Sequence, residues 1–205
     1  MTISRRQQKA ETRQKLMDAA AEELASGRSF DTLSLREVAK IAGIAPTSFY
    51  RHFHDMEGLG LALLEEHGST LQGLMQRVRE QASEGKSLIR VSVETLFDYI
   101  DRHQGMSRML LQESMSAQPD FRGAAEKLLA NLAGDLAEYL VREAAERGVP
   151  LGHPQVAASS IVAILFTKGI ALLNTPDADR DQYVESAIVQ LRMIMHGAET
   201  MGRMS

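Results

Sequence analysis

The sequence contains no cysteine and no tryptophan, and only five of its 205 residues are proline. Without cysteine the chain has no disulfide framework, no thiolate chemistry and no cysteine-based zinc site. Aromatic residues make up 5% of the chain, whereas alanine, leucine, glutamate, glutamine, arginine and methionine abound. This balance favours an all-helical protein. The N-terminus also lacks the apolar core of a signal peptide, so we expect a cytoplasmic protein.

Sequence signatures of catalysis are missing as well. None of the six histidines has an aspartate or glutamate three or four positions before it, which removes the Glu-x-x-His pattern of helical di-iron proteins. No H-E-x-x-H, G-x-S-x-G, P-loop or G-x-G-x-x-G motif occurs. We therefore expect no enzymatic activity, no catalytic residues, no metal site and no cofactor.

The charge is unevenly distributed along the chain. The net charge is −4, which alone argues against a nucleic-acid partner. Residues 1–53, however, hold nine lysines and arginines against six aspartates and glutamates, and the arm from Arg5 to Lys15 is the densest part. A basic N-terminal third on an acidic body concentrates attraction for nucleic acid at that end.

The stretch from Ser34 to Phe53 reads as two short helices joined by a tight turn. Ser34 and Glu37 form an S-x-x-E capping box, which marks the start of a helix. Gly43 suits the left-handed conformation that ends such a helix, and Pro46 suits the first turn of the next one. The pattern is typical of a helix-turn-helix.

The second of these helices has two different sides. Phe49 and Phe53 lie four residues apart and anchor the helix in a core beneath it. The opposite side carries small hydroxyls and amphipathic donors, which suit a major groove and its flanking phosphates. These outward residues are Thr47, Ser48, Tyr50, Arg51 and His52.

The stretch resembles the DNA-binding domain of the TetR family of bacterial repressors, whose recognition helix typically ends Tyr-x-His-Phe, here residues 50–53. The string IAPTSFYRHF at Ile44–Phe53, followed by Leu59–Leu61, is similar to the branch that controls unsaturated fatty acid synthesis, the FabR and DesT repressors. Ser87–Val93 and Gln190–Gly197 resemble that branch more weakly. The sequence departs from the family where a capping Ser or Thr and a Lys are frequent, here Ala45 and Met56.

The resemblance implies a two-domain homodimer that binds a palindromic DNA operator. Residues 1–54 would form the DNA-binding domain and residues 55–205 the ligand-binding and dimerisation domain. Thr47 and Ser48 would contact base edges, and five residues would hold phosphates: Arg36, Lys40, Tyr50, Arg51 and His52. For His52, a structural role is the alternative.

Beyond the first domain the sequence predicts an array of helices. The first helix of the chain runs from about residue 8 to 26, and Asp55 caps a long helix that reaches about residue 82. Three further helices are expected over residues 86–103, 106–114 and 119–148, before the loop Val149–Pro154. The fold class is therefore all-α, of TetR type.

The segment Val156–Leu173 is nearly continuous in apolar and small residues, although Lys168 and several hydroxyl residues interrupt it. Its length approaches a membrane span, but no positive flank anchors it, so we expect a buried helix and no membrane partner. The last helix carries a stripe with the spacing of a left-handed helix pair: Val184, Ile188, Leu191, Met195 and Ala198. We expect the two helices to form a four-helix bundle with a second subunit; an intramolecular core is the alternative.

A ligand-binding region is the remaining expectation. Met106, Met109 and Met115 cluster with apolar residues, which is ordinary core filling or, as the family resemblance implies, a cavity for a small molecule. The candidate ligand-binding residues are Leu96, Phe97, Ile100, Met106, Met109, Leu110, Phe121 and Phe166. Lys168, Arg108 and Arg122 are candidates for an anionic group of the ligand, and nothing in the sequence ranks them.

From the resemblance, the effector would be a long-chain acyl thioester of coenzyme A or of acyl carrier protein, and its shape would tilt the long helix. The alternative within the family is a repressor of an efflux or catabolic operon that senses another apolar compound. A helical lipid carrier with a basic, membrane-facing patch is the rival from another class. DNA binding distinguishes that rival from both repressors.

Overall fold

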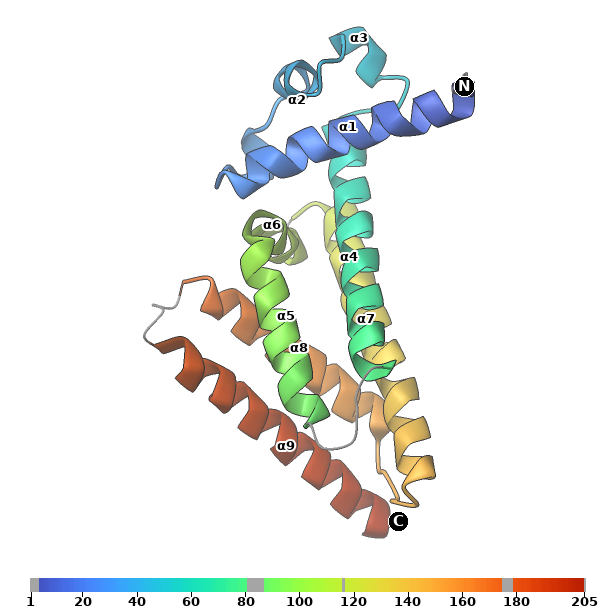
Figure 1. Ribbon diagram of the computed structural model, residues 1–205, viewed down its shortest axis with the longest axis vertical. Helices are drawn as coiled ribbons and strands as arrows, with labels where there is room; N and C mark the ends of the chain where they lie inside the picture. The colour runs from blue at the N-terminus through green and yellow to red at the C-terminus, as the bar shows by residue number, and fades with distance from the viewer. Residues whose placement is uncertain (1–3, 81–86, 116, 175–178, 205) are drawn as a thin grey trace. The chain divides into compact units, whose positions relative to one another are not determined.

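The computed structural model describes residues 4–80, 87–115, 117–174 and 179–204, and these residues form helices and connecting turns without a strand (Figure 1). This confirms the all-α fold class. The elements are α1 (Arg5–Ala25), the 3-10 helix η1 (Phe30–Thr32), α2 (Leu35–Ile41), α3 (Pro46–Phe49), α4 (Met56–Glu80), α5 (Leu88–Arg102), α6 (Gln104–Ser114), α7 (Pro119–Glu146), α8 (Pro154–Leu172) and α9 (Arg180–Met204).

Local sequence signals explain where these helices begin and end. Ser4 caps α1, because its Oγ accepts a hydrogen bond from the Gln7 amide at 3.2 Å, and the helix therefore starts earlier than residue 8. Asp55 caps α4 as predicted, since its Oδ1 accepts from the Gly58 amide at 2.8 Å. The predicted end of that helix at residue 82 lies outside the described residues.

The chain divides into two compact units. The first comprises the chain up to Gly68 together with His103–Ala125, and the second comprises Ser69–Arg102 together with the chain from Glu126. Helices α4 and α7 contribute residues to both units. The functional division of the chain at residues 54 and 55 stays a prediction.

The first unit has a core built from α1, α2, α3, the start of α4 and the segment 103–125. Leu16, Leu24, Phe49 and Leu59 are fully buried in it, and α2 packs on both α1 and α3 (Figure 1). The ring of Phe30 meets the ring of Phe121 edge-on, with centroids 6.1 Å apart.

Two glycines allow close packing inside the first unit. A Cβ at Gly60 would lie 2.7 Å from the ring of Phe30 and 2.8 Å from that of Phe121. At Gly105, near the start of α6, a Cβ would overlap the backbone carbonyl of Leu24, at the end of α1. The segment 103–125 is thus fitted closely to the helices that precede it in this unit.

The second unit is organised around α5, α8 and α9, which pack on one another. Val93, Leu172 and Ile188 are fully buried in its core. At the edge of this core Arg90 of α5 forms a two-pronged ion pair with Glu185 of α9, with nitrogen–oxygen distances of 2.6 and 2.9 Å.

The prediction that the apolar stripe on α9 contacts a second subunit is wrong for the residues at the centre of the stripe. Ile188 and Leu191 are 0% and 3% exposed, and they are already buried against the helices of their own unit. Val184 and Met195 pack against the same core, and Ala198 is also buried. The stripe therefore forms intramolecular core, because a period of 3.5 residues describes packing on any neighbouring helix and does not specify which chain provides it.

Helix α8 is long and apolar enough to cross a membrane by length and composition alone, with a mean hydropathy of 1.6 over 18 residues. A core helix of a soluble protein passes the same test. Its Lys168 donates to the Ser186 hydroxyl at 3.1 Å and lies 4.6 Å from the centroid of the Tyr183 ring. The charge in the apolar segment is thus placed against polar and aromatic groups of α9.

Candidate nucleic-acid interface

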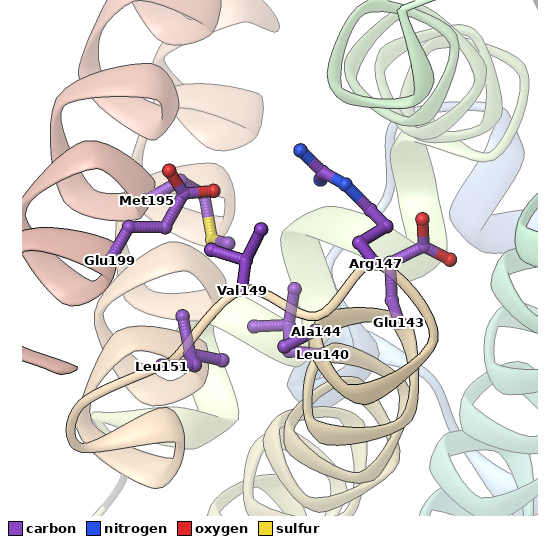
Figure 2. Close-up of a pocket in the computed structure, with 8 residues that line it drawn as sticks. All are labelled: Leu140, Glu143, Ala144, Arg147, Val149, Leu151, Met195 and Glu199. Atoms are coloured by element: carbon purple, nitrogen blue, oxygen red, sulfur yellow. The ribbon is translucent and has the colours of Figure 1, made fainter. Parts of the chain in front are cut away.

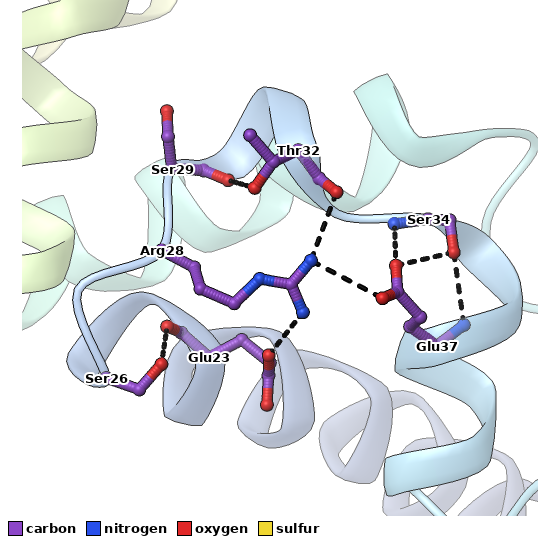
Figure 3. Close-up of polar contacts among 7 residues, drawn as sticks. All are labelled: Glu23, Ser26, Arg28, Ser29, Thr32, Ser34 and Glu37. Carbon is purple, nitrogen blue, oxygen red and sulfur yellow. Dashed lines mark hydrogen bonds and ion pairs between the residues drawn. The ribbon is translucent and has the colours of Figure 1, made fainter.

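Helix α2 begins with the capping box that the sequence predicts (Figure 3). The Ser34 hydroxyl accepts from the Glu37 amide at 3.3 Å, and the Glu37 carboxylate accepts from the Ser34 amide at 3.0 Å and from its hydroxyl at 2.7 Å. These bonds lower the pKa of Glu37, the Ser34 hydroxyl being the largest cause. The capping box satisfies two amides that a seven-residue helix would otherwise leave without a partner.

Arg28 joins this cap to the end of α1 (Figure 3). Its guanidinium contacts Glu23 of α1 at 2.7 Å, the carbonyl oxygen of Thr32 at 3.2 Å and Glu37 of α2 at 3.4 Å. The two carboxylates raise the pKa of Arg28, with the hydrogen bond to Glu23 as the largest cause. One planar side chain thus fixes the loop that leads into α2.

The turn between α2 and α3 follows from Gly43. Its φ of +67° is left-handed, and the Ile44 amide donates to the carbonyl oxygen of Ala39 at 2.8 Å, as in a Schellman motif. Ala45 then occupies the N-cap of α3 and provides no side-chain hydrogen bond, while Pro46 opens the helix. The recognition helix is therefore short and has little local support.

Two aromatic anchors hold α3 against the core of the first unit. Phe49 and Phe53 are 0% and 4% exposed, and their ring centroids lie 5.7 Å apart. Both were expected to face inward. Phe49 ends the helix and Phe53 follows the turn after it, so this inner side leaves Thr47, Tyr50 and Arg51 exposed on the opposite side.

The predicted DNA-contacting residues lie on the outer side of α2, α3 and the turn after α3. Tyr50 is 65% exposed, and the half-buried Ser48 and His52 flank it. The remaining residues are all exposed: Arg36, Lys40, Thr47 and Arg51. Their individual roles toward bases and phosphates stay predictions.

His52 sits in a positive environment. Burial lowers the pKa of its imidazole, and the charges of Lys9, Arg13 and Arg51 lower it further. Its Nδ1 is buried and has no hydrogen-bond partner among the described residues. A neutral ring whose Nδ1 faces inward would carry its proton on Nε2, where it suits donation to a phosphate oxygen.

Sequence reasoning missed the position of Arg13. In the sequence it is one charge of the basic arm from Arg5 to Lys15, whereas in the structure it is half-buried and reaches the end of the helix-turn-helix. Its partners, His52 and Phe53, lie about 40 residues away in the chain. No local pattern could have found a contact of that sequence separation.

The predicted ligand-binding residues are divided between the two units. Leu96, Phe97, Ile100 and Phe166 belong to the second unit, and Met106, Met109, Leu110 and Phe121 belong to the first. All but Met106 and Phe166 are buried. Met115, which the sequence grouped with them, is instead 80% exposed. Their function in ligand binding stays a prediction.

The second unit also carries a depression with about 260 Å³ of empty space, part of it open to solvent (Figure 2). Its lining comes from the end of α7, the loop after it and α9, and includes Arg147, Met195 and Glu199. None of the predicted ligand-binding residues lines it.

The helix-turn-helix lies inside a segment that matches a known family. Residues 18–63 match the model of the bacterial regulatory proteins of the tetR family. A relative from Haemophilus influenzae, described as an uncharacterized HTH-type transcriptional regulator, is 43% identical over 94% of this chain and 92% of its own length.

Two solved structures share the fold. One is the fatty acid degradation regulator FadR from Bacillus halodurans, with 18% identity, a TM-score of 0.72, and coverage of 88% of this chain and 96% of that one. The other is a putative transcriptional regulator from Pseudomonas aeruginosa PAO1, with 16% identity, a TM-score of 0.75 and 93% coverage of both chains.

A capped helix, a glycine turn, a short second helix with an exposed hydroxyl and a following turn with basic groups together form a helix-turn-helix. The class of protein is a helix-turn-helix transcriptional regulator that binds DNA. Its relatives are regulators, and it is not an enzyme. The chain belongs to the TetR family of bacterial regulatory proteins.

Proposed function

We propose that this regulator is a repressor of unsaturated fatty acid synthesis that responds to long-chain acyl thioesters, of coenzyme A or of acyl carrier protein. The observation that carries the proposal is the resemblance over Ile44–Phe53, which includes the outward residues of α3. Helix-turn-helix proteins with different operators share similar residues at buried positions, because those positions pack in the same way. Outward positions face the operator, so resemblance there supports a similar operator and similar regulated genes.

The DNA contacts follow from the positions of the exposed groups. Thr47 and Ser48 would contact base edges, while Tyr50 and His52 would hold phosphates. Arg36, Lys40 and Arg51 would add further phosphate contacts. Two such helices must reach successive major grooves, about 34–36 Å apart, which requires two copies of the chain on a palindromic operator.

We place the contact between the two copies on the uncovered sides of α8 and α9. Only 33% of the 18-residue apolar stretch of α8 is buried within its own chain. Val156 on α8 and Val189 and Met193 on α9 are large apolar side chains that are at least half exposed. A second copy would remove this apolar surface from water.

A charge at Met193 tests the dimer. We expect Met193→Glu to shift the protein toward monomer in sedimentation velocity, because an unpaired carboxylate in a subunit contact is costly. Asn131→Glu places the same group at an exposed polar position of α7, outside the proposed contact, and should leave the dimer intact. A Met193→Glu protein that sediments like the wild type would move the interface elsewhere.

The effector proposal rests on the resemblance and on the apolar character of the candidate residues. In the second unit, the side chain of Ile100 closely approaches Gly169 on α8, and the Phe97 ring lies beside it. Packed interiors respond to small changes of ligand shape. A cis double bond changes the shape of an acyl chain and leaves its polarity nearly unchanged. The likeness to the fatty acid degradation regulator FadR, at 18% identity, concerns the fold alone.

A titration tests the effector. The wild-type protein is first used to enrich a preferred duplex from a random-sequence library. Its affinity for that duplex is then measured at fixed salt with palmitoyl-, palmitoleoyl- and oleoyl-CoA. We expect unsaturated chains to strengthen DNA binding and the saturated chain to weaken it, since only ligands that favour different states have opposite effects. Three identical curves, or no response, would favour a repressor of an efflux or catabolic operon with another apolar effector.

The setting of this function is the cytoplasm, where a DNA-binding regulator meets its operator. Membership of the TetR family argues against the rival class, a helical lipid carrier. A gel shift with the enriched duplex and a scrambled duplex separates the two. A carrier would bind both duplexes equally and weakly.

A further inference from the structure

The recognition helix depends on contacts from outside itself for its orientation. It is only four residues long, its N-cap Ala45 makes no side-chain hydrogen bond, and the chain turns away directly after Tyr50. A helix of this length has no stability of its own in water. Its placement must therefore come from the residues that hold its inner side and its end.

Arg13 of α1 makes two such contacts at once. Its Nη1 donates to the carbonyl oxygen of His52 at 3.0 Å, and its Cζ lies 4.1 Å from the centroid of the Phe53 ring. Phe53 packs in turn on Phe49, which belongs to α3. One side chain thus links the middle of α1 to the end of the recognition helix.

We propose that Arg13 is a positioning residue that sets the orientation of the recognition helix, and not a phosphate contact. The planar guanidinium stacks on a ring and donates in its own plane at the same time. A lysine retains the charge, but its ammonium group cannot supply both contacts in this fixed geometry. The inference is independent of which operon the regulator controls.

The two roles predict different effects on DNA binding. Loss of a phosphate contact weakens binding to every duplex alike and reduces the salt dependence by about 0.9 in the slope of log K against log salt. Loss of orientation misplaces the groups that read base edges, so that binding to the preferred sequence falls while non-specific attraction remains.

The test compares Arg13→Lys and Arg13→Ala with the wild type. Binding constants are measured over a salt series for the duplex enriched by the wild-type protein and for a scrambled duplex of the same composition. We expect both variants to lower the ratio of the two affinities by about tenfold or more, with an unchanged salt slope on the scrambled duplex. Lys9→Ala, which removes an exposed charge from the same helix, should leave that ratio unchanged.

Hydrogen exchange gives a second reading that does not involve DNA. The amides of His52 and Phe53, which donate to the Phe49 carbonyl oxygen at 2.8 and 3.0 Å, should exchange faster in Arg13→Lys. Should Arg13→Ala fail to fold, Arg13→Lys and Phe53→Leu still carry the test, and both should lose discrimination. The proposal would be overturned if Arg13→Lys kept the wild-type ratio of affinities for the two duplexes. It would also be overturned if Arg13→Ala lost affinity equally for both duplexes and showed a smaller salt slope.

Discussion

Replacement of Gly105 by alanine should destabilise the protein, although the same change usually stabilises a helix. A Cβ at this position would overlap the backbone carbonyl of Leu24, and it would lie 2.8 Å from the amide nitrogen of Ala25. Backbone atoms at the end of α1 cannot rotate away as the tip of a side chain can. Either α6 or the end of α1 must therefore move.

The size of the effect follows from two opposing contributions. Extra volume in a well-packed site costs about 1–3 kcal/mol. The gain in helix propensity is smaller than about 0.5–1 kcal/mol, because Gly105 is the second residue of α6 and does not lie in a helix interior. The net cost is then about 0.5–3 kcal/mol, and for a chain of this length we expect the melting temperature to fall by about 1–12 °C.

The assay is thermal unfolding of the full-length protein, followed by circular dichroism. Gly123→Ala is the matched control, since Gly123 lies inside α7 in the same unit and a methyl group added there would meet no atom of the described residues within 4 Å. It should raise the melting temperature by about 1–4 °C. If Gly105→Ala melted at or above the wild-type temperature, the close contact between α1 and α6 would not exist in solution.

Three further predictions concern the first unit. Burial, and to a lesser extent the charge of His103, lowers the pKa of His67 to about 4. Because an unfolded histidine has a pKa of about 6.5, the folded protein should lose stability as the pH falls from about 6.5 toward 4. His67→Gln should make the melting temperature fall less over this pH range. Ser34→Ala should cost about 1 kcal/mol in urea unfolding through loss of the α2 cap, and an unchanged midpoint would contradict the capping role. Thr47→Ala should relax sequence preference at about 1–3 kcal/mol per lost base contact, whereas Tyr50→Phe should weaken binding to all duplexes and flatten the salt dependence. Equal sequence preference in the Thr47 variant and the wild type would remove that residue from base recognition.

The local structure of the helix-turn-helix could be predicted because its signals are local. The capping box at Ser34, the left-handed Gly43 and the inward spacing of Phe49 and Phe53 each depend on neighbours fewer than five residues away. The same holds for the limits of α6 and α7, which differ from the predicted ones by no more than two residues.

Long-range contacts could not be predicted in this way. A hydrophobic stripe shows that one side of α9 is covered, but it does not show by which helix, and Leu191 was therefore assigned to a subunit contact when it lies in the core of its own unit. Arg13 was read as one charge among several, because its contact with the His52 carbonyl exists only after folding. Neither fact is encoded in the spacing of neighbouring residues.

The close fit of residues 103–125 to the first unit has a practical consequence for chimeric regulators. Phe121 meets Phe30 and Gly60, and Gly105 meets the end of α1, although these pairs are far apart in the sequence. A graft of the N-terminal residues alone onto a foreign sensor would leave those contacts to whatever side chains the recipient provides. A chimera that keeps the DNA specificity of this protein therefore needs two segments of the chain: the N-terminal helices with the helix-turn-helix, and residues 103–125 from α6 and the start of α7.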